Sequence, residues 1–140
     1  MANTFYNEIL TDHNMNPIHK KKIENPTLTL EGVNPSCGDD IILGLEVKDG
    51  VVVDGGFEGD GCAISQASCD IMLELCIGKP VDEAKRLAEI FIRMITGKIT
   101  DEEKEELEEA AILENVSHMP ARTKCAVLGW HTMEEMLNEK

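Results

Sequence analysis

The sequence predicts an α+β domain, with a small three-stranded antiparallel sheet and helices packed on one of its faces. Strand-like patterns lie before Gly61, and helix-like periodicity runs from there to the C-terminus. Apart from one short helix near the N-terminus, strands come first and helices follow them, which is typical of an α+β domain. We expect residues 1–140 to form a single domain, because two domains in 140 residues would be cramped.

The strand predictions depend on one long stretch, DIILGLEVKDGVVVDGGFEGDG. Two apolar-rich runs in it flank Asp49-Gly50, and Asp-Gly is a strong hairpin signal. We therefore predict antiparallel strands near 40–48 and 51–58. A short strand over 27–31 would complete the sheet.

Helices are predicted on both sides of these strands. Before them, FYNEILTDHNMNP is typical of a short amphipathic helix that ends at Asn16-Pro17. After them, apolar residues recur at steps of three and four. The first predicted helix starts at Gly61 and stops at Gly78, and the second follows Pro80, has Ala84 on its inner stripe and ends at a cap at Gly97. The third runs from a capping box at Thr100 and Glu103 to about Leu113, and the last from about Thr123 to Asn138. Between the last two, ENVSHMPA is predicted to be a loop.

Composition limits the possible partners. The net charge is −14, which phosphate backbones repel, so we expect no nucleic-acid partner. No apolar run is long enough to span a membrane, and the N-terminus MANTFYNEIL lacks the pattern of a signal peptide. We therefore expect a cytoplasmic protein with no membrane partner, whose five cysteines are thiols or metal ligands rather than disulfides.

Two of the five cysteines are predicted to be core residues. Cys69 and Cys76 fall inside the helix that starts at Gly61, seven residues apart, and Cys62 precedes them by another seven. Each step of seven residues climbs roughly 10 Å along a helix. The three thiols therefore cannot share one metal, and free cysteine is among the most buried residue types.

The other three cysteines lie in loops or at helix starts. Cys37 lies in the turn NPSCGDD, where Asp39 can present its side chain in the same direction. Cys62 follows a glycine-rich turn at a helix N-terminus, and Cys125 falls in the first turn of the last helix. The positive end of a helix favours thiolate there.

These positions make Cys37, Asp39, Cys62 and Cys125 candidate metal ligands. Three thiolates and one carboxylate suit tetrahedral zinc or a sulfur-rich iron site. Arg122 and Lys124 would favour the Cys125 thiolate from positions just outside the ligands. The alternatives stay open, because the thiols can be turn residues without function, Asp39 a turn residue, and the two cations ordinary surface charges.

Three motifs carry a family resemblance: NPSCGDDI, FEGDGCAISQASCDIM and PARTKCAVLGW. In order and context they resemble the cysteine motifs of the iron–sulfur cluster assembly scaffold family, which includes IscU, the N-terminal domain of NifU, and SufU. The resemblance covers nearly the whole chain and implies a SufE/IscU-like fold with a three-stranded antiparallel sheet. It also implies that Cys37, Asp39, Cys62 and Cys125 are the site residues.

Three departures point to the SufU branch of that family. Lys124 stands where other scaffolds have a histidine before the last cysteine, and MPARTK replaces their chaperone-binding Leu-Pro-Pro-Val-Lys segment. The stretch from about 97 to 118 is also longer. The resemblance to SufU implies a protein that binds zinc and takes sulfur from a SufS-like cysteine desulfurase, upstream of other Fe–S assembly proteins.

The sequence thus supports three hypotheses. The first is a zinc-dependent sulfurtransferase in which Cys37, on its loop, attacks the desulfurase persulfide while Arg122 and Lys124 steer the incoming anion. In this hypothesis Asp39, a harder ligand than thiolate, exchanges readily. The second is a scaffold that assembles a [2Fe–2S] cluster on the same ligands, so that iron replaces zinc. The third is a non-catalytic protein with a structural zinc.

Overall fold

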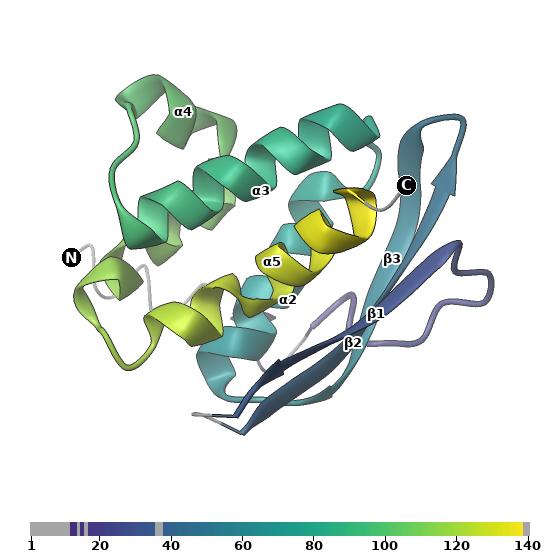
Figure 1. Cartoon of the computed structure of the whole chain (residues 1–140), viewed down its shortest axis with the longest axis horizontal. Helices are drawn as coiled ribbons and strands as arrows, with labels where there is room; N and C mark the ends of the chain where they lie inside the picture. The colour runs from purple at the N-terminus through teal and green to yellow at the C-terminus, as the bar shows by residue number, and fades with distance from the viewer. Residues whose placement is uncertain (1–11, 14, 16, 36–37, 139–140) are drawn as a thin grey trace.

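The computed structural model describes residues 12–13, 15, 17–35 and 38–138, and it shows a sheet with helices on one face (Figure 1). The strands are β1 (Leu28–Asn34), β2 (Asp39–Lys48) and β3 (Val51–Asp60), antiparallel in the order β1-β2-β3. The helical elements are α2 (Ala63–Cys76), α3 (Val81–Thr96), α4 (Asp101–Glu106), the 3₁₀ helix η1 (Glu108–His118) and α5 (Thr123–Asn138). The predicted α+β class is confirmed.

The β2–β3 hairpin turns at the predicted Asp49-Gly50. Asp49 has φ 53° and Gly50 has φ 76°, so both central residues are left-handed, as a two-residue turn between twisted strands requires. Lys48 and Val51 are paired on either side of this turn. At the far end of the hairpin Asp40 pairs with Asp60, so the start of β2 lies beside the residues that lead into α2.

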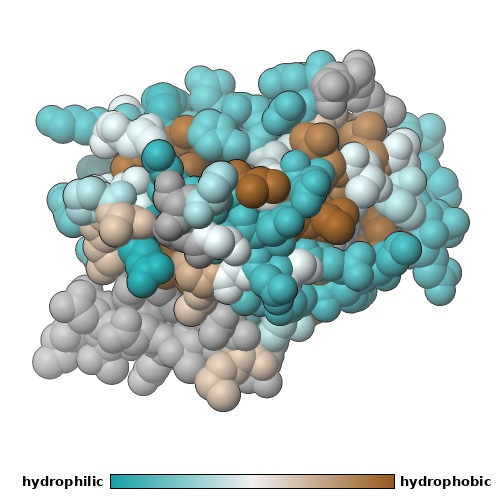
Figure 2. All heavy atoms as spheres, turned by 60° about the horizontal axis from the view of Figure 1, so that its bottom comes forward, coloured by the Kyte–Doolittle hydropathy of each residue, from teal (hydrophilic) through white to brown (hydrophobic). Residues whose placement is uncertain are grey.

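The core lies between the sheet and the helices. Alternate residues of β2 are buried on the face that the helices cover: Ile41, Leu43, Leu45 and Val47. Between α3 and α5, the Phe91 and Trp130 rings stack with centroids 4.1 Å apart. The surface is mostly hydrophilic with small hydrophobic areas on the face that Figure 2 shows, consistent with the high net charge.

Helices α2 and α5 approach each other closely because small residues line their contact. A Cβ on Gly129 of α5 would lie 3.1 Å from the Cys69 sulfur of α2, so Gly129 allows the contact. Cys69 and Cys76 are both fully buried, as predicted. Burial raises the pKa of Cys76 to about 12 and that of Cys69 further, so both stay protonated thiols.

The prediction of one acidic α-helix to about Leu113 is wrong beyond Glu106. The capping box at Thr100 and Glu103 is present, but α4 ends after six residues and η1 replaces both the rest of that helix and most of the predicted loop. Four buried apolar residues are spaced by three: Leu107, Ala110, Leu113 and Val116. Three residues per turn is the 3₁₀ period, so this geometry turns all four toward the core, whereas an α-helix would rotate them apart.

The predicted N-terminal helix lies mostly outside the described residues. His13, within them, is buried, and its Nδ1 lies 2.6 Å from Asp70 of α2 while its Nε2 contacts Glu109 of η1. The His19 backbone N–H also donates to Asp70, at 2.8 Å. The segment before β1 is therefore anchored to α2.

Among the helices within the described residues, none combines the length and the apolar character needed to cross a membrane.

Candidate metal centre

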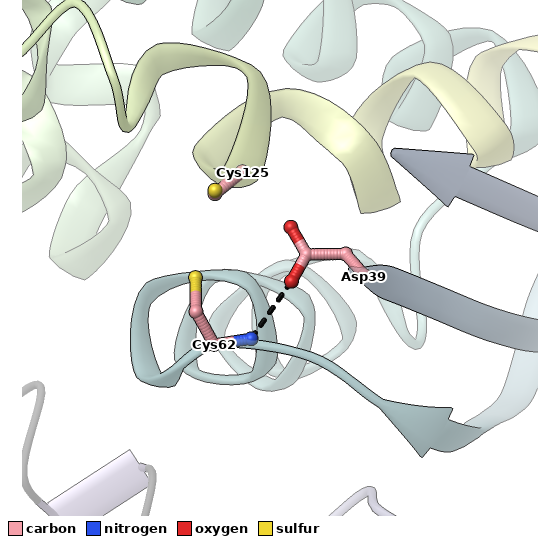
Figure 3. Close-up of side chains that lie close together, drawn as sticks. All are labelled: Asp39, Cys62 and Cys125. Carbon is pink, nitrogen blue, oxygen red and sulfur yellow. Dashed lines mark hydrogen bonds between the residues drawn. The ribbon is translucent and has the colours of Figure 1, made fainter. Parts of the chain in front are cut away.

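Three of the four predicted ligands come together in the structure. Asp39, Cys62 and Cys125 each offer one ligand atom, and these atoms lie within 4.8 Å of one another (Figure 3). Asp39 starts β2, Cys62 precedes the first residue of α2, and Cys125 lies in the first turn of α5. The fourth, Cys37, falls in the stretch 36–37, outside the described residues.

The Asp39 carboxylate is buried, with 1% of its surface exposed, and its orientation is fixed by hydrogen bonds. Its Oδ1 accepts the Cys62 backbone N–H at 2.8 Å, and its Oδ2 faces the Asn34 side-chain amide at 3.5 Å. Figure 3 shows the second oxygen turned toward the side of Cys125. Oδ1 is thus held by the Cys62 backbone N–H, while Oδ2 is turned toward the side of Cys125.

Cys62 is the N-cap of α2. Its Sγ accepts the Ser65 backbone N–H at 3.4 Å, so the thiol occupies the place of a capping oxygen. Gly61, the residue before Cys62, allows the backbone to pass close to both Ser65 and Asp39. A Cβ on Gly61 would lie 3.0 Å from Ser65 Oγ and 3.1 Å from Asp39 Oδ1.

Cys125 is fully buried, and the packing of α5 on α2 fixes its position. The Ser68 hydroxyl of α2 donates to the Ala126 carbonyl at 2.6 Å and accepts the Trp130 indole N–H at 3.0 Å. The Asn34 side-chain amide also lies 3.9 Å from the Cys125 sulfur. Three elements therefore hold this thiol beside Asp39.

The two predicted basic neighbours occupy different surroundings. The pKa of Arg122 is raised by the charge of Cys62, and next by a hydrogen bond to Cys125 and the charge of Cys125, so its guanidinium lies near both thiols. Lys124 is exposed and lines a neighbouring pocket of about 420 Å³ together with Asn34 and Val127. Arg122 is thus the cation at the two thiols.

The residues present fit a thiolate-binding metal. Tetrahedral zinc with Zn–S bonds near 2.3 Å holds its ligand atoms roughly 3.5–3.8 Å apart, so no two of the three ligand atoms need to close by more than about 1 Å. Two sulfurs and one carboxylate favour zinc or iron over magnesium or calcium. The buried Ser65 hydroxyl lacks a hydrogen-bond partner among the described residues, which leaves a donor free beside the centre.

Sequence reasoning missed three polar residues around this centre: Asn34, Ser65 and Ser68. Asn34 stands at the start of the quoted motif NPSCGDDI, and the two serines stand within CAISQASC, so each was visible in a motif. Their contacts were not visible, because Asn34 and Cys125 are 91 residues apart in the chain.

Comparisons with known proteins agree with the geometry. The chain matches the family described as NifU-like N terminal domain over residues 5–126. It is 42% identical over 134 residues to the iron–sulfur cluster assembly scaffold protein IscU of Thermotoga maritima, covering 96% of this chain and 93% of that protein. It is 37% identical over 132 residues to the zinc-dependent sulfurtransferase SufU of Bacillus subtilis, covering 94% of this chain and 88% of that protein.

A solved structure gives the same result for the fold. The crystal structure of a candidate iron–sulfur cluster assembly scaffold protein for the SUF system, from Fervidobacterium islandicum, superposes with a TM-score of 0.88. The two chains are 37% identical, and the match covers 98% of this chain and 99% of that one. The sheet with helices on one face is therefore shared with this relative.

Proposed function

This chain belongs to the NifU-like N-terminal domain family of iron–sulfur cluster assembly proteins, and we propose that it is a zinc-dependent acceptor of persulfide sulfur from a cysteine desulfurase. The observation that carries this proposal is the convergence of Asp39, Cys62 and Cys125 within 4.8 Å. The similarity to a protein named zinc-dependent sulfurtransferase supports zinc as the metal.

The proposed ligands are these three side chains together with Cys37. Cys37 stands two residues before Asp39, so covalent geometry keeps their Cα atoms within about 7 Å. Zinc bound here would hold the thiols as thiolates at neutral pH. Cys37 is the proposed acceptor, because the sequence predicts it on a turn, whereas Cys62 and Cys125 stand at helix starts.

The transfer step is a thiol–persulfide exchange. The Cys37 thiolate attacks the terminal sulfur of the desulfurase persulfide and forms a new S–S bond. The S–S bond within the desulfurase breaks, its cysteine leaves as a thiolate, and the transferred sulfur keeps the charge that it carried on the desulfurase. The step needs no oxidant, because one disulfide-type bond replaces another.

Arg122 and Asp39 have distinct roles in this proposal. The exposed Arg122 guanidinium, which lies near both thiols, offers its charge to the incoming anionic sulfur. Asp39 is a harder ligand than thiolate, so it would be the ligand that a bound metal exchanges most readily. Its buried position would keep the carboxylate at the centre.

A second candidate function is assembly of a [2Fe–2S] cluster on the same ligands. The relative named scaffold protein IscU, at 42% identity, favours it. The classical scaffolds have a histidine directly before the last cysteine, whereas this chain has Lys124 there, and this difference favours the sulfur acceptor. A structural zinc without catalysis is the third reading of the same geometry.

The decisive experiment is desulfurase turnover with and without this protein. We expect the zinc-loaded protein to stimulate alanine release and Cys37→Ala to abolish the stimulation, while Cys76→Ala, which removes a buried core thiol, retains it. Stimulation by Cys37→Ala at the normal rate would overturn the role of Cys37. Metal analysis and a visible absorption spectrum of freshly purified protein distinguish zinc from a [2Fe–2S] cluster. If the zinc-loaded protein does not stimulate the desulfurase, the remaining hypothesis is a structural zinc without catalysis.

A further inference from the structure

Ser65 carries an unpaired hydroxyl in the interior of the protein. The residue is 1% exposed, and its Oγ has no hydrogen-bond partner among the described residues. Buried polar groups are almost always paired, and an exception calls for an explanation. Ser68, one turn further along α2, shows the usual condition, because its hydroxyl is paired with both Ala126 and Trp130.

The unpaired hydroxyl lies beside Asp39. A Cβ placed on Gly61 would be 3.0 Å from Ser65 Oγ and 3.1 Å from Asp39 Oδ1, so both oxygen atoms border the same small space. Since Gly61 has no side chain, nothing of that residue fills this space. The two oxygen atoms therefore lie no more than about 6 Å apart, since each is about 3 Å from that position.

Oδ1 is the carboxylate oxygen on the Cys62 side, whereas Oδ2 is turned toward the side of Cys125 (Figure 3). Oδ1 already accepts the Cys62 backbone N–H at 2.8 Å, which leaves it room for a second donor. Oδ2 is the oxygen left to face a cation. A second donor on Oδ1 would fix the plane of the carboxylate. Asp39 would then bind a metal through one oxygen only, Oδ2.

We propose that Ser65 is a positioning residue of the metal centre, whose hydroxyl donates to Asp39 Oδ1 when Oδ2 binds the metal. The proposal rests on the metal-binding part of the proposed function and goes beyond it by assigning a residue that orients a ligand. Hydrogen-bonded partners of metal ligands typically contribute 10–100-fold to metal affinity.

The test is zinc dissociation into excess chelator, measured for wild type, Ser65→Ala and the control Ser117→Ala in η1. We expect Ser65→Ala to release zinc about tenfold faster. Its metal-free form should unfold at the same temperature as wild type or higher, because the unpaired hydroxyl is gone. Ser117→Ala should match wild type in both measurements.

Cobalt substitution gives a readout that a structural role would not change. The visible ligand-field bands of the Co²⁺ protein should shift in Ser65→Ala, because the carboxylate orientation changes. A Ser65→Ala protein with wild-type zinc release and wild-type cobalt bands would overturn the role of Ser65 while leaving the metal centre intact. A wild-type protein that binds neither zinc nor cobalt would overturn the metal centre itself, and the role of Ser65 with it.

Discussion

The Ser68 hydroxyl donates to the Ala126 carbonyl oxygen at 2.6 Å, across the contact between α2 and α5. Cys62 precedes α2, and Cys125 is the residue before Ala126. This hydrogen bond joins the two helices that carry Cys62 and Cys125. It therefore helps to set the distance between two thiols that are far apart in the sequence.

Replacing Ser68 with alanine should destabilise the fold. The fully buried Trp130 indole N–H would lose its acceptor, and an unpaired buried donor costs about 1–3 kcal/mol. Urea unfolding of the metal-free protein measures the change, with Ser117→Ala as a control expected within about 0.5 kcal/mol of wild type. A Ser68→Ala protein as stable as that control would show that the hydroxyl does not hold the two helices together.

Asp39→Ala should weaken zinc binding, whereas Asp40→Ala should not. Asp39 is buried beside the thiols, while Asp40 is exposed on the opposite face of β2. Removal of a residue that only supports a metal ligand lowers metal affinity by about 10–100-fold. We expect Asp39→Ala to lower zinc affinity by at least that much. Competition with a chelator measures the affinity of both variants. Unchanged zinc affinity and unchanged sulfur transfer in Asp39→Ala would remove that residue from the centre.

Arg122→Ala should slow sulfur transfer more than Lys124→Ala does. The Arg122 guanidinium lies near both thiols, and Lys124 lines the neighbouring pocket. A decrease of about tenfold or more in kcat/KM of the desulfurase reaction is expected, since charge-stabilising donors contribute at least that much. Arg122→Lys should recover part of the rate. Equal effects of the two alanine variants would mean that only general surface charge attracts the donor.

The buried His13 should make stability depend on pH. Burial alone lowers the pKa of His13, but the hydrogen bonds to Asp70 and Glu109 and the charges of those carboxylates raise it above its ordinary value. A raised folded-state pKa gives stabilisation that is complete below the unfolded value of about 6.5 and is lost as pH rises through the folded-state pKa.

The corresponding measurement compares wild type with His13→Gln by urea unfolding at several pH values. The stability advantage of wild type should be largest below about pH 6.5 and should shrink as the pH rises above it. Stability curves that stay parallel across this range, or an advantage that grows with pH, would show that His13 is not held as a cation between Asp70 and Glu109.

The local predictions from sequence were accurate where one pattern decides the structure. Asp49-Gly50 specified the hairpin, because two left-handed residues fit only that kind of turn. The last helix spans Thr123–Asn138 as predicted, and Cys69 and Cys76 lie in the core. Each of these features depends on neighbours within a few turns of the chain.

The stretch after Glu106 shows where local patterns are insufficient. A good capping box and many helix-favouring residues predicted an α-helix to about Leu113. The need to bury Leu107, Ala110, Leu113 and Val116 on one side favours a 3₁₀ helix instead. Tertiary burial outweighed helix propensity there, as it often does.

The sequence alone determined the fold class, the hairpin, the core thiols and the identity of the candidate ligands, because each follows from residue type and short-range spacing. Only the tertiary structure placed Asp39, Cys62 and Cys125 together and brought Arg122 to both thiols. It also revealed the supporting contacts of Asn34, Ser65 and Ser68. The physical reason is that these groups meet through the packing of α5 and α2 against the open end of the hairpin, and no short stretch of sequence encodes that distance.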